Sequence, residues 1–192
     1  CSAGSQIIGG LRARQETLIW TDVALYSLQF IGAPFTFGLN LVNEGVSLVG
    51  PNAAINTPSG VFWMDRKGFY KYSGTVQSIK CSVQFYVYSD FNQSQSYQFF
   101  GFVNKEFNEV FAFVNKQFDE VGWFYCSSTN TVIDRYVTYN YVEQTWAIGN
   151  LSRTSWLDEG LESFPRATGT SSSSNYVFSH ETGFDDEDSP MD

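Results

Sequence analysis

The chain has 192 residues, 43% of them hydrophobic and 18% aromatic, which is enough for one domain with a sizeable core and argues against intrinsic disorder. Its formal net charge of −9 disfavours tight binding to phosphate backbones, which needs clustered Lys and Arg. A single histidine, His180, excludes catalysis or zinc binding that needs two histidines within one chain.

The N-terminal segment, residues 1–15, is polar and contains glycine, and we interpret it as a lead-in. Its first residues, Cys1-Ser2-Ala3-Gly4, would also suit a mature bacterial lipoprotein, so a lipid anchor stays open as an alternative. The three cysteines, Cys1, Cys81 and Cys126, form no C-x-x-C pair, which excludes zinc ribbons and thioredoxin-like chemistry. We expect them to be buried as small apolar side chains.

From Leu18 onward, short aromatic and β-branched runs alternate with turn residues, which is typical of strands. We expect hairpin turns at Asp65–Gly68 and Ser127–Asn130. Helix is expected in few places, and the best candidate is Ser82–Gln98, which lacks glycine and proline. The clearest predicted strands are Leu18–Trp20, Leu25–Phe30, Val61–Met64, Gly68–Tyr72, Val121–Tyr125 and Tyr136–Tyr141.

A Trp-x-Asp pattern recurs at Trp20, Trp63 and Trp156, at spacings close to one and two units of about 45 residues. Units of this length are typical of β-propeller blades, whose sheets must stack to bury both faces. The aspartate after each tryptophan is expected to cap a hairpin turn. An all-β sandwich with chance repeats is the alternative.

Residues 100–110 are repeated almost unchanged as residues 111–121. This period is too short for a blade. It fits either a hairpin of two similar strands or a local duplication that lengthens one blade, and we favour duplication because the turn residues Asn104-Lys105 and Asn115-Lys116 are kept as well. The pattern predicts no function.

Towards the C-terminus, Thr168–Ser174 is rich in Ser, Thr and Gly and is expected to be a mobile surface loop. The acidic segment 181–192 is expected to be solvated. Its run Asp185–Asp188 has oxygen ligands suited to Ca²⁺ but lacks the glycine and distant Glu of an EF-hand loop. No apolar run exceeds about six residues, so no membrane span is predicted.

Some β-propellers are glycosidases, which use a pair of carboxylates, so we ask whether the carboxylates of this chain could form such a pair. Equivalent positions in successive blades point outward or cap turns, and do not converge on one substrate. They include Asp22, Asp65 and Asp158, and, in the tandem repeat, Glu106, Glu109, Asp119 and Glu120. Arg135 and Arg153 are expected to pair with nearby aspartates such as Asp134 and Asp158.

His180 is the one candidate base for a nucleophilic site, and its neighbours are Ser179 and Glu181. Neighbours on a strand face opposite ways, so we expect a hydrogen-bonding histidine near a strand end instead of a catalytic group. The sequence therefore predicts no enzyme, no catalytic or metal-ligating residue and no cofactor.

Seven phrases follow one another along the chain, at residues 31–38, 47–54, 60–65, 104–110, 134–146, 152–158 and 180–183. In this order they resemble the propeller region of bacteriophage tail-nozzle proteins, also called packaged-DNA stabilisation or tail tube hub proteins. The resemblance covers roughly residues 12–188, and the insertion of 111–121 before Trp123 departs from it.

The resemblance implies a structural virion protein of the tail that forms a hexameric ring below the portal and adaptor, extends and closes the DNA channel, and contacts tail fibres or spikes. Double-stranded DNA would pass without sequence-specific binding. We thus expect an all-β partial propeller of about four four-stranded antiparallel blades over residues 16–180, with little helix. A secreted or lipid-anchored carbohydrate-binding propeller is the alternative.

Overall fold

The computed structural model describes residues 6–104, 119–157, 165–171, 174–180, 185–186 and 189–190. They form four antiparallel sheets that follow one another along the chain, and a short hairpin. The first sheet holds β1 (Ile7–Arg12), β2 (Thr17–Thr21), β3 (Ala24–Phe30) and β4 (Phe37–Glu44); the second holds β5 (Ala54–Thr57), β6 (Gly60–Met64), β7 (Phe69–Tyr72) and β8 (Val76–Ile79). The third holds β9 (Phe100–Asn104), β10 (Glu120–Tyr125), β11 (Arg135–Asn140) and β12 (Thr145–Gly149); the fourth holds β13 (Ser155–Leu157), β14 (Arg166–Ser171) and β15 (Ser174–Ser179). The hairpin pairs β16 (Asp185–Asp186) with β17 (Ser189–Pro190).

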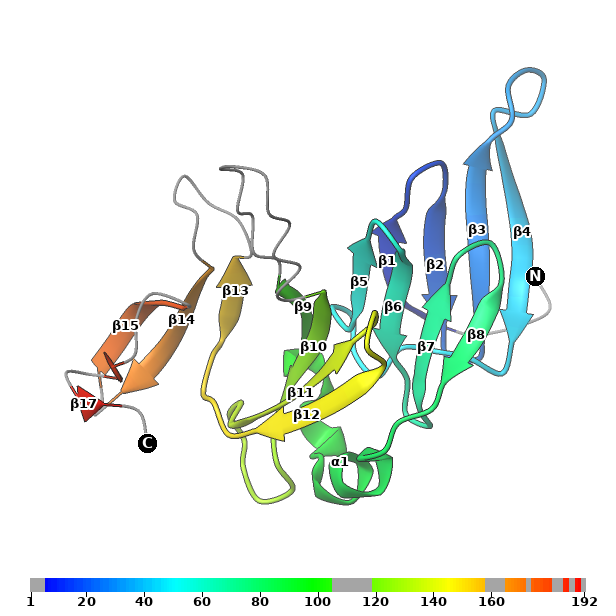
Figure 1. Cartoon of the computed structure of the whole chain (residues 1–192). Coiled ribbons are helices and arrows are strands. Elements are labelled where there is room, and N and C mark those ends of the chain that lie inside the picture. The colour runs from blue at the N-terminus through cyan, green and yellow to red at the C-terminus, as the bar shows by residue number, and fades with distance from the viewer. Residues whose placement is uncertain are drawn as a thin grey trace.

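Each sheet is a meander in which strands adjacent in sequence pair with one another. The first strands of consecutive sheets are neighbours in space: β1 contacts β5, β5 contacts β9, and β9 contacts β13. Figure 1 shows the first and fourth sheets at opposite ends of the series. This is the arrangement of an open, partial β-propeller, which confirms the predicted all-β class and differs from the two facing layers of a sandwich.

Aromatic side chains hold successive sheets together. The rings of Trp20 and Trp63 lie 5.5 Å apart between the first and second sheets, and Phe69 lies 5.0 Å from Trp123 between the second and third. Between the third and fourth sheets, Phe102 packs 4.8 Å from Trp156. All three tryptophans of the predicted Trp-x-Asp pattern therefore lie at junctions between sheets.

The predicted helix is present but interrupted. Residues Gln84–Asp90 form α1, and Gln93–Gln98 form two short 3₁₀ turns with a kink at Gln95. Phe91 and Asn92, between α1 and these turns, are extended. The Asn92 side chain accepts a hydrogen bond from the Ser94 amide at 3.1 Å, and its backbone amide donates to the Cys126 carbonyl. Phe91 thus ends α1, and Asn92 caps the helical segment that follows.

Three expectations need correction. The first sheet begins within the segment that we interpreted as a lead-in before the blades, since β1 lies in residues 1–15 and pairs with β2. The Ser/Thr-rich stretch expected as a mobile loop is largely strand, because Thr168 and its neighbours in β14 pair with β13 and β15. The fourth sheet has three strands in the described part of the chain, where four were expected. Residues 105–118, most of the tandem repeat, lie outside the described residues.

Candidate assembly surface

Asp65 and Asp22, the two described aspartates of the repeated pattern, lie at turns between strands, and Asp65 caps its turn as predicted. Asp65 is buried and accepts hydrogen bonds from the backbone amides of Ser47 (3.2 Å) and Arg66 (2.5 Å). Burial raises the pKa of Asp65, although those hydrogen bonds oppose the rise. Asp22 accepts from the Gln6 amide at 3.3 Å, and Asp158 lies outside the described residues. Both carboxylates therefore serve the fold.

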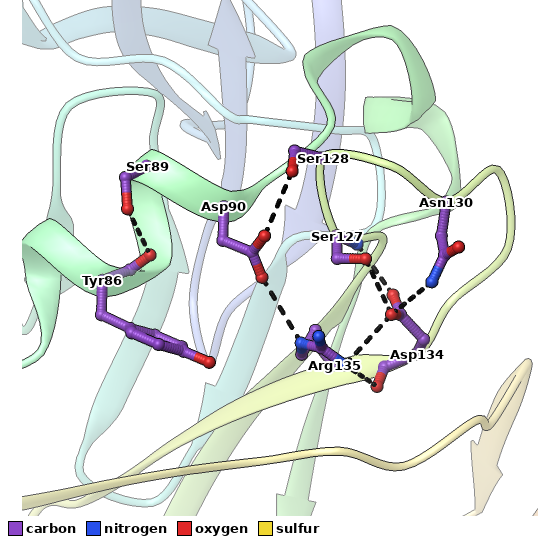
Figure 2. A network of polar contacts seen from close by, with 8 residues as sticks. All are labelled: Tyr86, Ser89, Asp90, Ser127, Ser128, Asn130, Asp134 and Arg135. Atoms are coloured by element: carbon purple, nitrogen blue, oxygen red, sulfur yellow. Dashed lines mark hydrogen bonds and ion pairs between the residues drawn. The ribbon is translucent and has the colours of Figure 1, made fainter.

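Arg135 lies in a polar network that joins the third sheet to α1 (Figure 2). Its guanidinium lies 3.1 Å from Asp134, the predicted partner, and 3.4 Å from Asp90 of α1, which the sequence did not indicate. Asp134 also accepts hydrogen bonds from Ser127 and Asn130. Burial alone would raise the pKa of Asp134, but these hydrogen bonds and Arg135 outweigh it and lower that pKa. The network fixes the loop between β10 and β11.

His180 follows β15 directly and has the hydrogen-bonding role that the sequence predicts. Its Nε2 accepts from Arg153 Nε at 3.0 Å, and its ring lies 4.7 Å from Trp156. The Arg153 guanidinium also lies 3.7 Å from the centre of the Phe178 ring. The expected Arg153–Asp158 pair and the neighbour Glu181 involve residues that the structure does not describe.

A cavity of about 320 Å³ lies between the third and fourth sheets. Its walls are mostly aromatic, and they include Glu120 together with His180. Asp119, next to Glu120 in sequence, instead accepts a hydrogen bond from the Tyr141 hydroxyl at 2.8 Å. Glu106 and Glu109 lie outside the described residues.

The cysteines agree with the predicted apolar role where they are described. Cys126 is buried and Cys81 is half-buried. Burial raises the pKa of each thiol to about 11, which makes both poor nucleophiles near neutral pH. Cys1 lies outside the described part of the chain.

One face of the first sheet is apolar and largely exposed. Phe37, Leu39 and Leu41 alternate along β4 and share that face with their cross-strand partners on β3, Phe30 and Leu28. The alternate positions Gln29, Gly38 and Asn40 face the other way. We call Ile19, Leu28, Leu39 and Leu41 the outer face.

Beyond the outer face, β3 and β4 are joined by a hairpin tip, residues 30–37, which we call the finger and which projects past the rest of the sheet (Figure 1). Four of its apolar side chains are more than half exposed: Phe30, Ile31, Phe35 and Phe37. With Leu39 and Leu41 they expose apolar area on the order of 600 Å². This is as large as the largest apolar patch on a typical monomer.

The outer face and the finger are the candidate surfaces that we did not single out from the sequence. The signal was present, because apolar residues occupy every second position from Leu28 to Phe30 and from Phe37 to Leu41. The same alternation is typical of any strand with one apolar face in the core and one polar face in solvent. It therefore does not predict whether another sheet covers the apolar face.

In the part of the chain that the structure describes, no helix is both long and apolar enough to cross a membrane.

A scan against models of known protein families finds none that matches this chain, and a search of curated proteins finds no match either.

Proposed function

We propose that this chain is a structural protein of a bacteriophage tail, part of the nozzle that extends and closes the DNA channel below the portal. In this proposal copies of the chain form a hexameric ring and attach to portal or adaptor proteins and to fibres or spikes. The chain is not an enzyme, and it acts in the virion through its interfaces.

The observation that carries the proposal is the outer face of the first sheet. The second sheet is covered on both faces by neighbouring sheets, and its strand β6 is buried from Val61 to Met64. Among the described residues, a neighbouring sheet covers only one face of the first sheet, yet the other face is also apolar. A face of this kind belongs in an interface, because large exposed apolar patches mark sites of protein association.

Charge supports the same role. A channel through which DNA passes must not bind the DNA tightly. The net charge of −9 repels phosphate groups, whereas a basic surface would bind them along the whole channel. The finger and β4 as far as Leu41, residues 30–41, contain no charged residue. Association through this region would therefore avoid direct repulsion between acidic proteins.

The roles of the five tryptophans do not favour the carbohydrate-binding alternative. Trp20, Trp63 and Trp123 are fully buried between sheets. Trp146 and Trp156 donate their indole N–H groups to the carbonyls of Lys80 and Val103. All five indoles therefore take part in packing between sheets or in tertiary hydrogen bonds, so no tryptophan offers the exposed ring that a sugar platform built on tryptophan would need.

The test is to locate the protein in the virion that encodes it. Antibodies against this chain, used in immunogold electron microscopy, should label the tail just below the capsid. In reconstituted tail assembly, a Leu39→Ser/Leu41→Ser variant of the outer face should be incorporated poorly. Asn40→Ser, on the opposite face of the same strand, should be incorporated normally. Virions without label, or equal incorporation of both variants, would overturn the proposal.

A further inference from the structure

The finger is apolar on both of its sides, whereas the hairpin below it is apolar on one. Phe30 and Phe37 lie on the side of the outer face, and their rings meet edge to face at 5.9 Å. Ile31 lies on the opposite side, since a Cβ on Gly38 would come within 3.3 Å of the Ile31 side chain. All three apolar side chains are more than half exposed. A partner that covers one side of the finger would therefore leave apolar surface in water on the other side.

The finger is also convex and stands apart from other strands. Strand β2 pairs with β3 no further than Leu28, so residues 30–37 have no third strand beside them among the described residues. A hydrogen bond from the Ile31 amide to the Thr36 carbonyl at 3.2 Å closes the hairpin, and Phe35 at the turn is 72% exposed. Figure 1 shows this tip projecting beyond the neighbouring strands. A fluid apolar medium can surround such a projection, whereas a flat protein surface touches it on one side.

Exposure distinguishes the finger from the other uncharged segments of the chain. Uncharged runs are common here, and Gly60–Met64 is one of them, but its side chains from Val61 to Met64 are buried. The β3–β4 hairpin contains no charged residue from Val23 to Asn43. In the finger the uncharged residues lie at the surface, so no charge has to leave water when the finger enters an apolar medium.

The length of the apolar tip matches a shallow insertion. Leu28 and Leu39 lie two residues further from the turn than Phe30 and Phe37, a distance of about 7 Å along the strands. Apolar side chains of interfacial segments are buried about 5–10 Å into the boundary between headgroups and acyl chains. A shallow position also suits a turn, because its backbone N–H and C=O groups would lose their hydrogen bonds to water at greater depth.

We infer that the finger inserts into the interfacial region of a lipid bilayer. Burial of its four exposed apolar side chains drives the insertion, and the bilayer covers both sides of the projection at once. The finger contains no Lys or Arg, so anionic headgroups are not needed for binding. This inference goes beyond the proposed function, which assigns contacts between proteins to the outer face.

Vesicle flotation with the full chain tests the insertion. The chain should float with phosphatidylcholine vesicles at low and at high salt, and addition of phosphatidylglycerol should not increase the bound fraction. Phe30→Ser/Phe35→Ser should weaken binding about tenfold or more, because two apolar side chains are lost from the inserted tip. Phe85→Ser is the matched control, since Phe85 on α1 is 88% exposed but lies outside the finger, and it should leave binding unchanged. Circular dichroism confirms that each variant is folded.

Quenching by lipids with brominated acyl chains gives the second readout. In Phe35→Trp, the tryptophan at the turn should be quenched by these vesicles, and the signal of the five native tryptophans is subtracted by measuring the wild-type chain. Phe85→Trp should show no added quenching, because α1 stays in water.

A wild-type chain that stays unbound at every lipid concentration would refute the insertion, as would equal loss of binding in the finger variant and in Phe85→Ser. A finger variant that binds vesicles normally but is incorporated poorly in tail assembly would place the finger in a protein interface and refute it as well. The proposed function is decided separately, by the position of the chain in the virion. A tail protein that does not bind vesicles would therefore refute this inference alone.

Discussion

Strands β6 and β4 each contain four large apolar residues, but the two strands have opposite surroundings. In β6, Val61, Phe62, Trp63 and Met64 are all buried, because the second sheet lies between two others. In β4, Leu39 and Leu41 remain about half exposed. Strand β6 is apolar at four consecutive positions, as expected of a strand that is covered on both faces, whereas β4 alternates apolar residues with Gly38 and Asn40. The exposed apolar face of β4 is therefore suited to an interface that it does not have within the described chain.

The largest effect on stability is expected when a side chain at a covered junction between two sheets is truncated. Trp63→Ala removes an indole that packs on both Trp20 and Tyr70. We expect a loss of about 3–5 kcal/mol in the free energy of unfolding, because a large cavity is left in the core. Urea denaturation followed by fluorescence measures it, and a loss below about 1 kcal/mol would show that this junction is not tightly packed.

Two glycines, one at a covered junction and one beside the exposed outer face, should also differ in their tolerance of a side chain. A Cβ on Gly122, which faces the fourth sheet, would lie 2.4 Å from the Phe102 ring, whereas a Cβ on Gly10, which pairs with Ile19 of the outer face, comes no closer than 3.5 Å to the Leu18 carbonyl oxygen. Gly122→Ala should therefore destabilise the protein by about 1–3 kcal/mol, while Gly10→Ala should change stability by less than about 0.5 kcal/mol. Thermal unfolding of the two variants compares them, and equal melting temperatures would contradict the packing.

The polar network gives a smaller, pH-dependent effect. Because the pKa of Asp134 is lowered in the folded protein, its charge stabilises the fold at pH values above its unfolded pKa of about 3.9. That contribution is lost as the pH falls through the lower folded pKa. Asp134→Asn should cost about 1 kcal/mol at pH 7 and progressively less in acid. A stability difference that does not depend on pH would mean that the charge of Asp134 is unimportant.

The smallest effect is expected on the outer face. Leu39→Ser should change the free energy of unfolding by less than about 0.5 kcal/mol, because the side chain is already half exposed in the single chain. It should nevertheless increase solubility, measured by ammonium sulfate precipitation. A large loss of stability would show that Leu39 is covered within one chain.

The repeated Trp-x-Asp pattern predicted much of the fold, since Trp20, Trp63 and Trp156 lie at the junctions between sheets and Asp65 caps a turn. Strand β1 was missed because Gly9 and Gly10 are poor strand formers. Gly9 is needed there for space, since a Cβ would come within 2.8 Å of the Pro51 carbonyl oxygen. A close approach between segments that are distant in the chain leaves no local sequence pattern from which it could be predicted.

The candidate surface was harder to predict than the fold. The apolar alternation around Leu39 indicates a strand, but whether a neighbour covers that face depends on how whole sheets are placed. The pairing of Arg135 with Asp90 was missed for the same reason, because the two residues come from different elements.

The adjacency of the first strands of successive sheets has a thermodynamic consequence. A linear series in which each unit contacts mainly the units before and after it gains stability one junction at a time, and a terminal unit has one junction fewer than an internal one. The fourth sheet, with three strands and one covered face among the described residues, is therefore expected to open first in native-state hydrogen exchange. Protection should increase towards β6 and β10, so the end of the series can rearrange during assembly while the middle keeps its structure.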